Sequence, residues 1–531
     1  MDAPKLGSSP RIAVVGGGPG GLFLATLVKR ALPEAAVTLF ERNQRSDAFG
    51  FGVVFSDATL RAIDEADPVL RDALRDHGRH WDRIDVLSNE QQHGFGGNGM
   101  SAIHRKVLLG LLQDNAEHVG VDLRFGTTAP PLDQLRNEYD LVVGADGTNS
   151  SVREHLDSEE PLGHEIDTAT AKFIWFGTTH LFDGLTFVHR VSEHGNFAVH
   201  GYPISNELST FIVETDEETW RRAGMDAFDV TQHPGPSDTE TQAYLEKLFA
   251  DDIGEGKLVA NNSRWGNFRT RRTRDWWRGN VVLLGDTVHT AHFSVGSGTK
   301  MAMEDSVVLA AQIARAATEG ISLSDALGAY QEIRKASVGK IQRAARPSLS
   351  WWEHFGTYQR TLDPLTFTFH FFSRSIGVEK MAQRDPGLVE KVRAAWIEQH
   401  GAAALDSTIE THSASTTTFG RRLELVSAEN GTAHLVDRDG RSITAPIITA
   451  PIIEAPATES GVASARKELP ETGVVVIAGS GLPRTLLAEA ARLQESLVTI
   501  MSGPDLAADD AAETVLLSGR ADAVAAPKET K

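Results

Sequence analysis

The spacing of hydrophobic and polar positions changes several times along this chain, and each pattern predicts a different kind of element. An apolar run at residues 11–15 is followed by a glycine-rich turn and by a helical pattern over residues 22–32. Strand and helix patterns then alternate to about residue 156, which is typical of a parallel sheet covered by helices. We therefore expect an α/β domain in residues 1–156.

The pattern becomes one of consecutive strands in the next part of the chain. Residues 173–177, 185–191, 197–202 and 210–214 are strand candidates separated by Gly, Asp and Asn. This order predicts a mainly antiparallel sheet, inserted as a second domain over residues 157–275. Helical patterns at 299–317, at 324–345 and up to about residue 400 then assign residues 276–400 to the second part of the α/β domain and to added helices.

A separate module is predicted at the end of the chain, because no Phe, Tyr or Trp follows Phe419. Residues 401–420 are interpreted as a linker, because their second half is rich in Ser and Thr. Residues 421–531 then form a small αβ module. Its Asn430-Gly431 and Asp439-Gly440 pairs suggest hairpins. A later strand pattern leads into Gly479-Ser-Gly481, which imitates a nucleotide-binding loop. Because Arg484 stands where the third glycine belongs, an ordinary αβ unit is the favoured reading.

Composition narrows the function classes. The 531 residues are 41% hydrophobic and 23% charged, with a formal net charge of −20, which argues against nucleic acid as a partner. No apolar run is long enough to span a membrane and the N-terminus lacks the pattern of a signal peptide, so a cytoplasmic protein without a membrane partner is expected. The absence of cysteine excludes disulfides, thiolate zinc sites and iron–sulfur clusters, and no histidine or acid cluster predicts a metal site.

The glycine-rich turn predicts a dinucleotide site. Its glycines allow a tight turn and a close approach of the backbone to a pyrophosphate, and the helix that follows directs free N–H groups at the same place. Glu41 ends the next predicted strand at the spacing of an acid that binds the adenosine ribose, and Arg42 follows it. The residues assigned to this site are Gly16, Gly18, Pro19, Gly20, Gly21, Glu41 and Arg42.

Two later segments extend this site to a flavin. Asp146-Gly147 follows an apolar strand and would meet the ribityl and pyrophosphate region, and Gly285-Asp286 follows another strand that delivers a carboxylate to the ribityl hydroxyls. The segment Gly296, Gly298 and Thr299 begins a helix whose N–H groups would face the flavin ring. Arg105 fits a pyrophosphate contact, with a solvated helix-end arginine as the alternative. The three segments together indicate bound FAD in a Rossmann-like domain.

From these motifs the chain resembles the single-component FAD-dependent aromatic hydroxylases of the para-hydroxybenzoate hydroxylase type, over roughly residues 10–400. Within that family, residues 52–57, 173–178 and 285–300 resemble the branch of salicyloyl-CoA 5-hydroxylase and 2-aminobenzoyl-CoA monooxygenase, with a more distant likeness to hydroxylases of violacein biosynthesis. The loop after Gly285-Asp286 carries His292-Phe-Ser294 in place of the usual proline-containing loop. The tail is too short for the complete (β/α)8 barrel of the aminobenzoyl-CoA enzymes, and no second flavin is expected.

The resemblance implies an FAD-dependent monooxygenase that uses NADH or NADPH and places one atom of O2 on an activated ring. The reaction expected first is 5-hydroxylation of salicyloyl-CoA to gentisyl-CoA, and 2-aminobenzoyl-CoA or an indolic compound is the alternative substrate. A general base would help the phenol to lose its proton, and the candidates are His292, His289 and His104. Each of them has a structural hydrogen-bonding role as its alternative.

A coenzyme A thioester needs positive charge, and arginines gather between residues 264 and 278. If residues 268–275 are extended, Arg269 and Arg271 share one face, and Arg272 and Arg274 share the other. Either pair would hold phosphates through charge-assisted hydrogen bonds. A solvated strand that balances nearby acids is the alternative, and a second basic set could serve instead. This second set consists of Arg334, Lys335, Lys340, Arg343 and Arg346.

Other classes fit less well. A flavoprotein halogenase would show a Trp-x-Trp-x-Ile-Pro stretch, and a flavin reductase would show a second complete nucleotide fingerprint, neither of which is present. A non-catalytic flavoprotein scaffold with the tail as a partner-binding module stays open. The sequence does not decide the oligomeric state.

Overall fold

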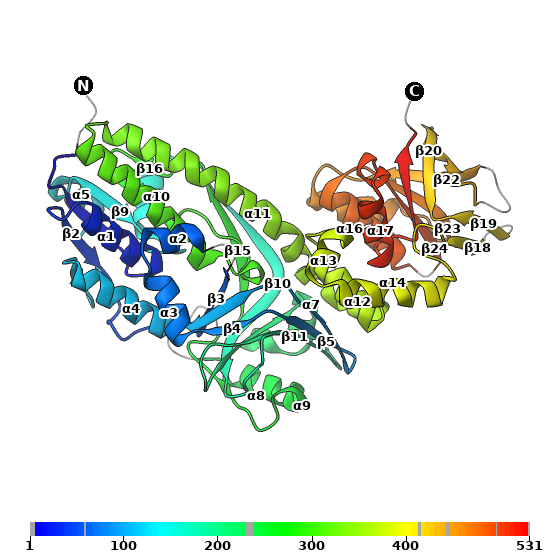
Figure 1. The fold of residues 1–531 in the computed structure, drawn as a ribbon, viewed down its shortest axis with the longest axis horizontal. Coiled ribbons are helices and arrows are strands. Elements are labelled where there is room, and N and C mark those ends of the chain that lie inside the picture. Colours follow the sequence, from blue (N-terminus) through cyan, green and yellow to red (C-terminus); the bar gives the residue numbers. More distant parts are fainter. Residues whose placement is uncertain are drawn as a thin grey trace. The chain divides into compact units, whose positions relative to one another are not determined.

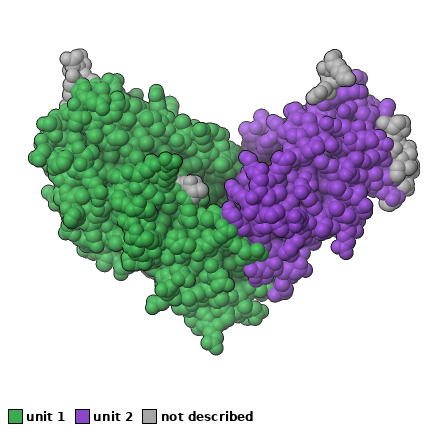
Figure 2. All heavy atoms as spheres, viewed as in Figure 1, with its two compact units in different colours: residues 1–85, 98–356 green, residues 86–97, 357–531 purple. Residues whose placement is uncertain are grey.

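The computed structural model describes residues 6–57, 60–228, 237–412, 416–441, 447–494 and 496–528. The chain forms two compact units. Unit 1 comprises Met1–Asp85 and Asn98–Gly356, and unit 2 comprises Val86–Gly97 and Thr357–Lys531 (Figure 2). Within the described ranges no helix has the length and apolar content needed to cross a bilayer.

A six-stranded, mainly parallel sheet forms one layer of unit 1 (Figure 1). Its strands in spatial order are β16 (Trp277–Arg278), β17 (Val281–Leu283), β9 (Leu141–Gly144), β1 (Arg11–Val15), β2 (Ala36–Phe40) and β8 (Asp122–Arg124). From β17 to β8 neighbouring strands run parallel, and only the edge strand β16 is antiparallel. The short, buried apolar runs suit the centre of such a sheet, and the arrangement confirms the predicted Rossmann-like domain.

Two helices pack closely beside this sheet, α1 (Pro19–Ala31) and α10 (Gly298–Thr318). Gly20 of α1 permits the contact, because an added Cβ would lie 2.7 Å from the Leu284 side chain and 3.1 Å from that of Ala302. The Ser306 hydroxyl of α10 donates to the Gly20 carbonyl at 2.8 Å. The strand β17 and the helix α10 therefore pack in the same layer system as the first residues of the chain.

The second layer of unit 1 is an antiparallel sheet, which confirms the predicted inserted domain. Its strands include β14 (Leu258–Val259), β10 (His164–Thr178), β13 (Ser209–Thr215), β12 (Gly195–Pro203) and β11 (Leu185–Ser192), in that order, and β15 (Gly266–Thr273) also pairs with β10. Side chains alternate between its faces, so that Phe173 and Trp175 of β10 lie on the face of Ile212, Glu214 and His200.

The remaining elements of unit 1 connect and cover these layers. They are β3 (Gly52–Ser56), α2 (Arg61–Ala66), α3 (Val69–His77), β4 (Arg79–Trp81), β7 (Met100–His104), α4 (Arg105–His118), α5 (Leu132–Glu138), α6 (Ser151–Glu159), α7 (Glu217–Arg222), α8 (Thr239–Leu248) and α9 (Ala250–Ile253). The long helix α11 (Leu323–Thr361) begins in unit 1 and ends in unit 2.

A closed six-stranded barrel forms the centre of unit 2. It contains β20 (Arg422–Glu429), β21 (Thr432–Asp437), β22 (Ile448–Glu454), β23 (Gly473–Ala478), β24 (Leu497–Ser502) and β25 (Ala523–Pro527). Neighbouring strands from β20 to β22 run antiparallel, and those from β22 to β25 run parallel. The barrel closes because β25 also pairs with β20, in parallel. Small and aliphatic side chains such as Leu423, Leu435 and Ile500 are buried in its core.

The other elements of unit 2 are helices and two hairpins. The helices are α12 (Pro364–Phe372), α13 (Val378–Arg384), α14 (Pro386–His400), α15 (Val462–Ala465), α16 (Gly481–Arg492) and α17 (Asp509–Leu517). One hairpin joins β18 (Thr408–His412) to β19 (Thr416–Gly420), and the other joins β5 (Ile84–Ser88), which begins in unit 1, to β6 (Gln91–Phe95). In the second hairpin, Phe95 packs on Phe372 of α12 with ring centroids 5.0 Å apart, and the amide of Gly96 donates to Asp385 at 2.8 Å.

A buried polar cluster also holds unit 2 together. The carboxylate of Glu489 on α16 accepts from Tyr358 at 2.6 Å and from Arg520 at 3.0 Å, and it lies 3.1 Å from His370. Arg520 additionally donates to the Ser373 hydroxyl at 2.7 Å. Burial would raise the pKa of Glu489, but His370 and Arg520 lower it to about 2, so the carboxylate is ionised at neutral pH.

These elements differ from the predicted domain boundaries in two ways. The predicted linker at residues 401–420 contains the β18–β19 hairpin, and its residues 413–415 lie outside the described ranges. The predicted boundary at residue 400 falls inside unit 2, because residues 357–400 belong with the barrel in this unit. The αβ nature of residues 421–531 is as predicted, but the closure of its strands into a barrel was not anticipated.

Candidate functional site

One cavity of about 840 Å³ lies in unit 1. Its first part is lined by the turns that follow β1, β9 and β17, and its second part by the antiparallel sheet. Ligands of open α/β sheets bind beyond the carboxyl ends of the strands, so the first part stands where a dinucleotide is expected. Of the predicted cofactor residues, those that line it are Gly18, Pro19, Gly20, Gly21, Arg105, Gly147, Gly285, Asp286, Gly296, Gly298 and Thr299.

The glycine turn leaves backbone donors open to this cavity. Helix α1 begins after Gly18 with no side-chain cap among the described residues, so the first N–H groups of the helix have no side-chain partner there. An added Cβ at Gly18, Gly147 or Gly298 would meet nothing within 4 Å, which means that the backbone at these glycines borders open space. Positive helix ends and exposed N–H groups favour a bound pyrophosphate.

Other glycines of the turn are required for close packing of the protein itself. Gly16 has φ +115°, and an added Cβ would lie 2.3 Å from the carbonyl oxygen of Ala145. At Gly21 the added Cβ would lie 2.1 Å from the carbonyl oxygen of Gly16. The Gly16 contact brings the turns after β1 and β9 together, and the Gly21 contact keeps the first turn tight. Flavin contacts by Gly16 and Gly21 stay predictions.

The predicted acids of the first two segments have protein partners. Glu41 accepts from the amide of Gly17 at 2.7 Å and from that of Asn43 at 2.8 Å, so its carboxylate lies at the glycine turn. Arg42 beside it is exposed. Asp146 accepts from the amide of Ser151 at 2.8 Å and thus holds the start of α6, whereas its neighbour Gly147 lines the cavity. Flavin contacts by Glu41, Arg42 and Asp146 stay predictions.

The start of α10 carries a polar atom without a protein partner. Ser297 lines the cavity, and its buried hydroxyl has no hydrogen-bond partner among the described residues. Buried hydroxyls are normally hydrogen-bonded, so this one is suited to a bound ligand. Asp286 lines the same region, and removal from bulk water raises its pKa, whereas the nearby His289 and Arg105 lower it.

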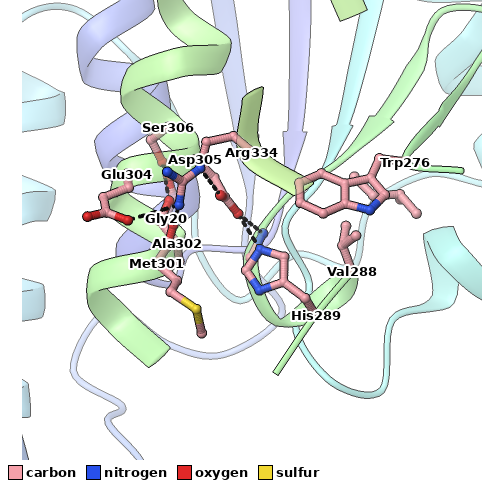
Figure 3. A network of polar contacts seen from close by, with 12 residues as sticks. Gly20, Trp276, Val288, His289, Met301, Ala302, Glu304, Asp305, Ser306 and Arg334 are labelled. Atoms are coloured by element: carbon pink, nitrogen blue, oxygen red, sulfur yellow. Dashed lines mark hydrogen bonds and ion pairs between the residues drawn. The ribbon is translucent and has the colours of Figure 1, made fainter. Parts of the chain in front are cut away.

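The Gly285-Asp286 turn is held by a buried carboxylate of α10, Asp305. Figure 3 shows this carboxylate between Arg334 and His289. One oxygen of Asp305 accepts from the amide of Gly285 at 3.0 Å and lies 2.7 Å from Nε2 of His289. The other oxygen accepts from Nε of Arg334 at 2.7 Å, and Arg334 also pairs with Glu304 at 2.9 Å. Burial would raise the pKa of Asp305, but His289 and Arg334 keep it below its usual value. Asp305 thus fixes the turn that presents Asp286.

The three histidines proposed as general bases do not line the large cavity. His289 is directed at Asp305, as above. His104 is half-buried and its Nδ1 accepts from the amide of Lys106 at 3.1 Å, where it caps α4. His292 is buried, with Nδ1 2.7 Å from the Ser294 hydroxyl and Nε2 3.3 Å from Glu214. Their proximity in sequence to the flavin loops did not bring their rings to the cavity.

The second part of the cavity is lined mainly by rings, together with a few polar groups. Its aromatic and aliphatic residues include Phe173, Trp175, Leu185, Phe187, Ile212, Trp220, Trp265, Phe268 and Phe293. His200 and Lys172 are polar residues of this wall that sequence reasoning missed. The alternation along the antiparallel strands was the signal that could have found His200, because it places this residue opposite Ile212.

The two predicted arginine pairs lie in different places, because successive side chains of the strand point to opposite faces of the sheet. Arg269 and Arg271 line the large cavity, whereas Arg272 borders a small separate cavity beside His292. Arg274 is on the surface and pairs with Asp275 at 2.9 Å. Burial lowers the pKa of Arg271, as do Arg153 and Arg269 nearby, which marks a concentration of positive charge on this side of the cavity.

Two further features that resemble ligand sites have protein partners of their own. In unit 2 the side chain of Arg484 lies against the Gly479-Ser-Gly481 loop. It donates to the Gly479 carbonyl at 3.2 Å and pairs with Asp505 at 2.6 Å. In unit 1 a surface group of Asp133, His155 and Glu159 has the composition of a metal site. Arg136 already pairs with Glu159 at 2.6 Å and lies 3.7 Å from Asp133.

Comparison with known proteins agrees with this geometry. The family model described as FAD binding domain matches residues 10–345. A salicyloyl-CoA 5-hydroxylase of a Streptomyces species is 49% identical over 531 residues, which cover 98% of this chain and 100% of the relative. The 3-hydroxy-4-methyl-anthranilyl-(aryl-carrier protein) 5-monooxygenase of Streptosporangium sibiricum is 32% identical over 357 residues, 67% of this chain and 93% of the relative. The p-nitrophenol 4-monooxygenase PnpA of Pseudomonas putida DLL-E4 shares the fold, with a TM-score of 0.54, 17% identity, and coverage of 72% of this chain and 96% of its own.

Proposed function

This chain belongs to the family of FAD-dependent monooxygenases that share this FAD binding domain, and from that membership we propose that it hydroxylates salicyloyl-CoA at position 5 to give gentisyl-CoA. The observation that carries the proposal is the likeness to the Streptomyces salicyloyl-CoA 5-hydroxylase along essentially the whole chain, including unit 2. The reaction consumes O2 and NADH or NADPH. Because NAD(P)H and acyl-CoA thioesters are cytoplasmic metabolites, we propose a cytoplasmic location.

The chain's residues would share the work as follows. The turns at Gly18 and Gly147 and the start of α10 fit the dinucleotide, and bound FAD supplies the redox chemistry that activates O2. The ring wall around Trp175 and Phe293 fits an aryl group and excludes water from it. The substrate hydroxyl makes the carbon para to it electron-rich, which selects position 5. Arg269 and Arg271 are the residues we assign to the phosphates of coenzyme A.

A second substrate class is an aminobenzoyl thioester. It is favoured by the Streptosporangium relative, whose name places an anthranilyl group on a carrier protein. An amino group directs hydroxylation to the same ring position, so the two substrates differ only in one substituent. The named relatives are enzymes, which argues against the non-catalytic scaffold considered from the sequence.

The experiment that tests the proposal compares salicyloyl-CoA, free salicylate and 2-aminobenzoyl-CoA with the FAD-loaded protein, NADH and air. We expect mass spectrometry to find one added oxygen on salicyloyl-CoA and none on free salicylate. Oxygen added only to the aminobenzoyl thioester would replace the first substrate by the second. NADH oxidation with peroxide and no oxygenated product from any of the three would reject both thioesters.

Arg269 provides a test of the coenzyme A assignment. Replacement by Ala removes a cavity-lining charge, and we expect the KM for the thioester to rise by about tenfold, the effect of losing about 1.4 kcal/mol, with little change in kcat. Arg274→Ala is the matched control, since Arg274 lies on the same strand region but pairs with Asp275 and is not among the residues that line the cavity. Equal KM values in the two variants would contradict the assignment.

A further inference from the structure

A buried carboxylate connects two histidines between the large cavity and the small one beside it. Glu214 on β13 has Oε2 3.2 Å from Nε2 of His200 and Oε1 3.3 Å from Nε2 of His292. The side chains of all three residues are at most 4% exposed. His200 lines the large cavity and His292 lines the small one. The charged chain His200–Glu214–His292 therefore begins at the wall of the substrate region.

The sheet register produces this arrangement. His200 of β12 lies opposite Ile212 of β13. Glu214 is two positions after Ile212 on β13, so its side chain lies on the same face of the sheet as that of His200. His292 reaches Glu214 from the loop before α10, where Nδ1 is already bonded to the Ser294 hydroxyl at 2.7 Å. Ser294 in turn lies 2.8 Å from the Ser348 hydroxyl of α11. Three separate elements thus converge on one carboxylate.

The carboxylate of Glu214 is charged, and its charge decides which nitrogen carries the proton in the imidazole rings of His200 and His292. Burial would raise the pKa of Glu214, but His200 and His292 lower it to about 2. A buried carboxylate needs hydrogen-bond donors, so each facing Nε2 carries its proton toward Glu214. In a neutral histidine of this tautomer the basic lone pair is on Nδ1. The ring of His200 borders the substrate region, and the ring of His292 borders the small cavity.

We propose that His200 is the catalytic base that takes the proton of the substrate's ring hydroxyl, with Glu214 and His292 as the positioning residues that hold and stabilise its imidazolium form. The inference rests on the proposed function, because it requires a hydroxylated aryl substrate. In the step, the O–H bond of the phenol breaks, the N–H bond of the imidazolium forms, and the electron pair stays on the phenolate oxygen. The proton returns to that oxygen before the product leaves, so the cycle is balanced without another acid.

The surroundings of His200 favour this single proton transfer. Besides Glu214 and His292, a titratable group near it is His189 of β11, whose pKa burial and His200 lower to about 3, so that His189 is neutral at pH 7. Its packed neighbours include the rings of Phe187, Phe293 and Trp352. A phenolate formed here is therefore paired with an imidazolium among aromatic rings, and the low polarity of these rings strengthens the attraction.

The test compares the wild-type holoenzyme with His200→Asn. Absorbance of bound salicyloyl-CoA measures the fraction of ionised phenol at each pH and needs no turnover. We expect the midpoint of this ionisation to rise by at least about one pH unit in the variant, and product formation to fall by about 100-fold while NADH still reduces the flavin. Glu214→Gln should shift the midpoint in the same direction by a smaller amount.

His189→Phe is the control, because it removes a buried histidine of the same sheet and keeps a ring against Trp352. We expect its ionisation midpoint and its product per NADH to equal those of the wild type. An unchanged midpoint in His200→Asn, or an equal shift in His189→Phe, would overturn the role of His200. Absence of product from the wild-type enzyme would reject the proposed function, while the titration of the bound thioester would still decide the role of His200.

Discussion

Replacement of Asp305 by Ala is expected to destabilise unit 1 by about 3–5 kcal/mol, because it leaves Arg334 and the amide of Gly285 without their buried carboxylate. The same carboxylate holds His289, so three contacts disappear at once. The turn that carries Asp286 should loosen, and FAD should dissociate more readily. The effect is large because Asp305 is fully buried and water cannot replace it.

Urea unfolding and the flavin retained after gel filtration measure these two effects. Glu304→Ala is the matched control, since Glu304 is the adjacent carboxylate of α10 and also contacts Arg334, but its side chain is 16% exposed. We expect the control to lose less stability than Asp305→Ala and to keep its flavin, because Arg334 retains its contact with Asp305. Similar stability and flavin content in the two variants would show that Asp305 does not hold the turn.

In unit 2, Glu489→Gln is expected to lower the opening free energy of the barrel helices by about 3 kcal/mol, because it leaves the guanidinium of Arg520 buried without a charge partner. Glutamine has the same volume and can still hydrogen-bond with Tyr358. The lost free energy therefore measures the effect of removing the negative charge. The residues that line the FAD part of the cavity are all in unit 1, and we expect the flavin content to be unchanged.

Amide hydrogen exchange measures this change locally, in α16 and β25 for unit 2 and in α1 and α10 for unit 1. Glu513→Gln is the control, since it breaks a surface pair with Arg393 in the same unit and should cost about 1 kcal/mol or less. Loss of protection in α1 and α10 equal to that in α16 would mean that the two units open together, against the expectation of separate units.

The parts of the fold that the sequence predicts well are those with local signals. The glycine turn at Gly16, the strands of the antiparallel sheet and the helix α10 each follow from a short pattern. Barrel closure depends on pairing between β20 and β25, whose partners are distant in the chain, so no local period reveals it. The Ser- and Thr-rich stretch before the barrel was interpreted as a linker because its composition does not distinguish a linker from the paired strands β18 and β19.

The candidate site shows the same division. Gly18, Gly147 and Gly298 line the cavity where their motifs placed them, and their contacts with FAD stay predictions. Side-chain roles could not be predicted, because the direction of a ring depends on its partner. His292 turns to Glu214, a residue far away in sequence, whereas His200 reaches the cavity through the sheet register. The arginine faces were predictable because alternation along β15 is a local property.

The hairpin strand β6 has a consequence for synthesis of the protein on the ribosome. It is translated within the first hundred residues, but its packing partner Phe372 and its hydrogen-bond partner Asp385 are translated much later. Domains fold as their residues emerge, so unit 2 cannot be completed when its first segment appears. We expect the nascent chain to carry β6 without these native partners, as a transient target for chaperones, until α12 and α14 leave the exit tunnel.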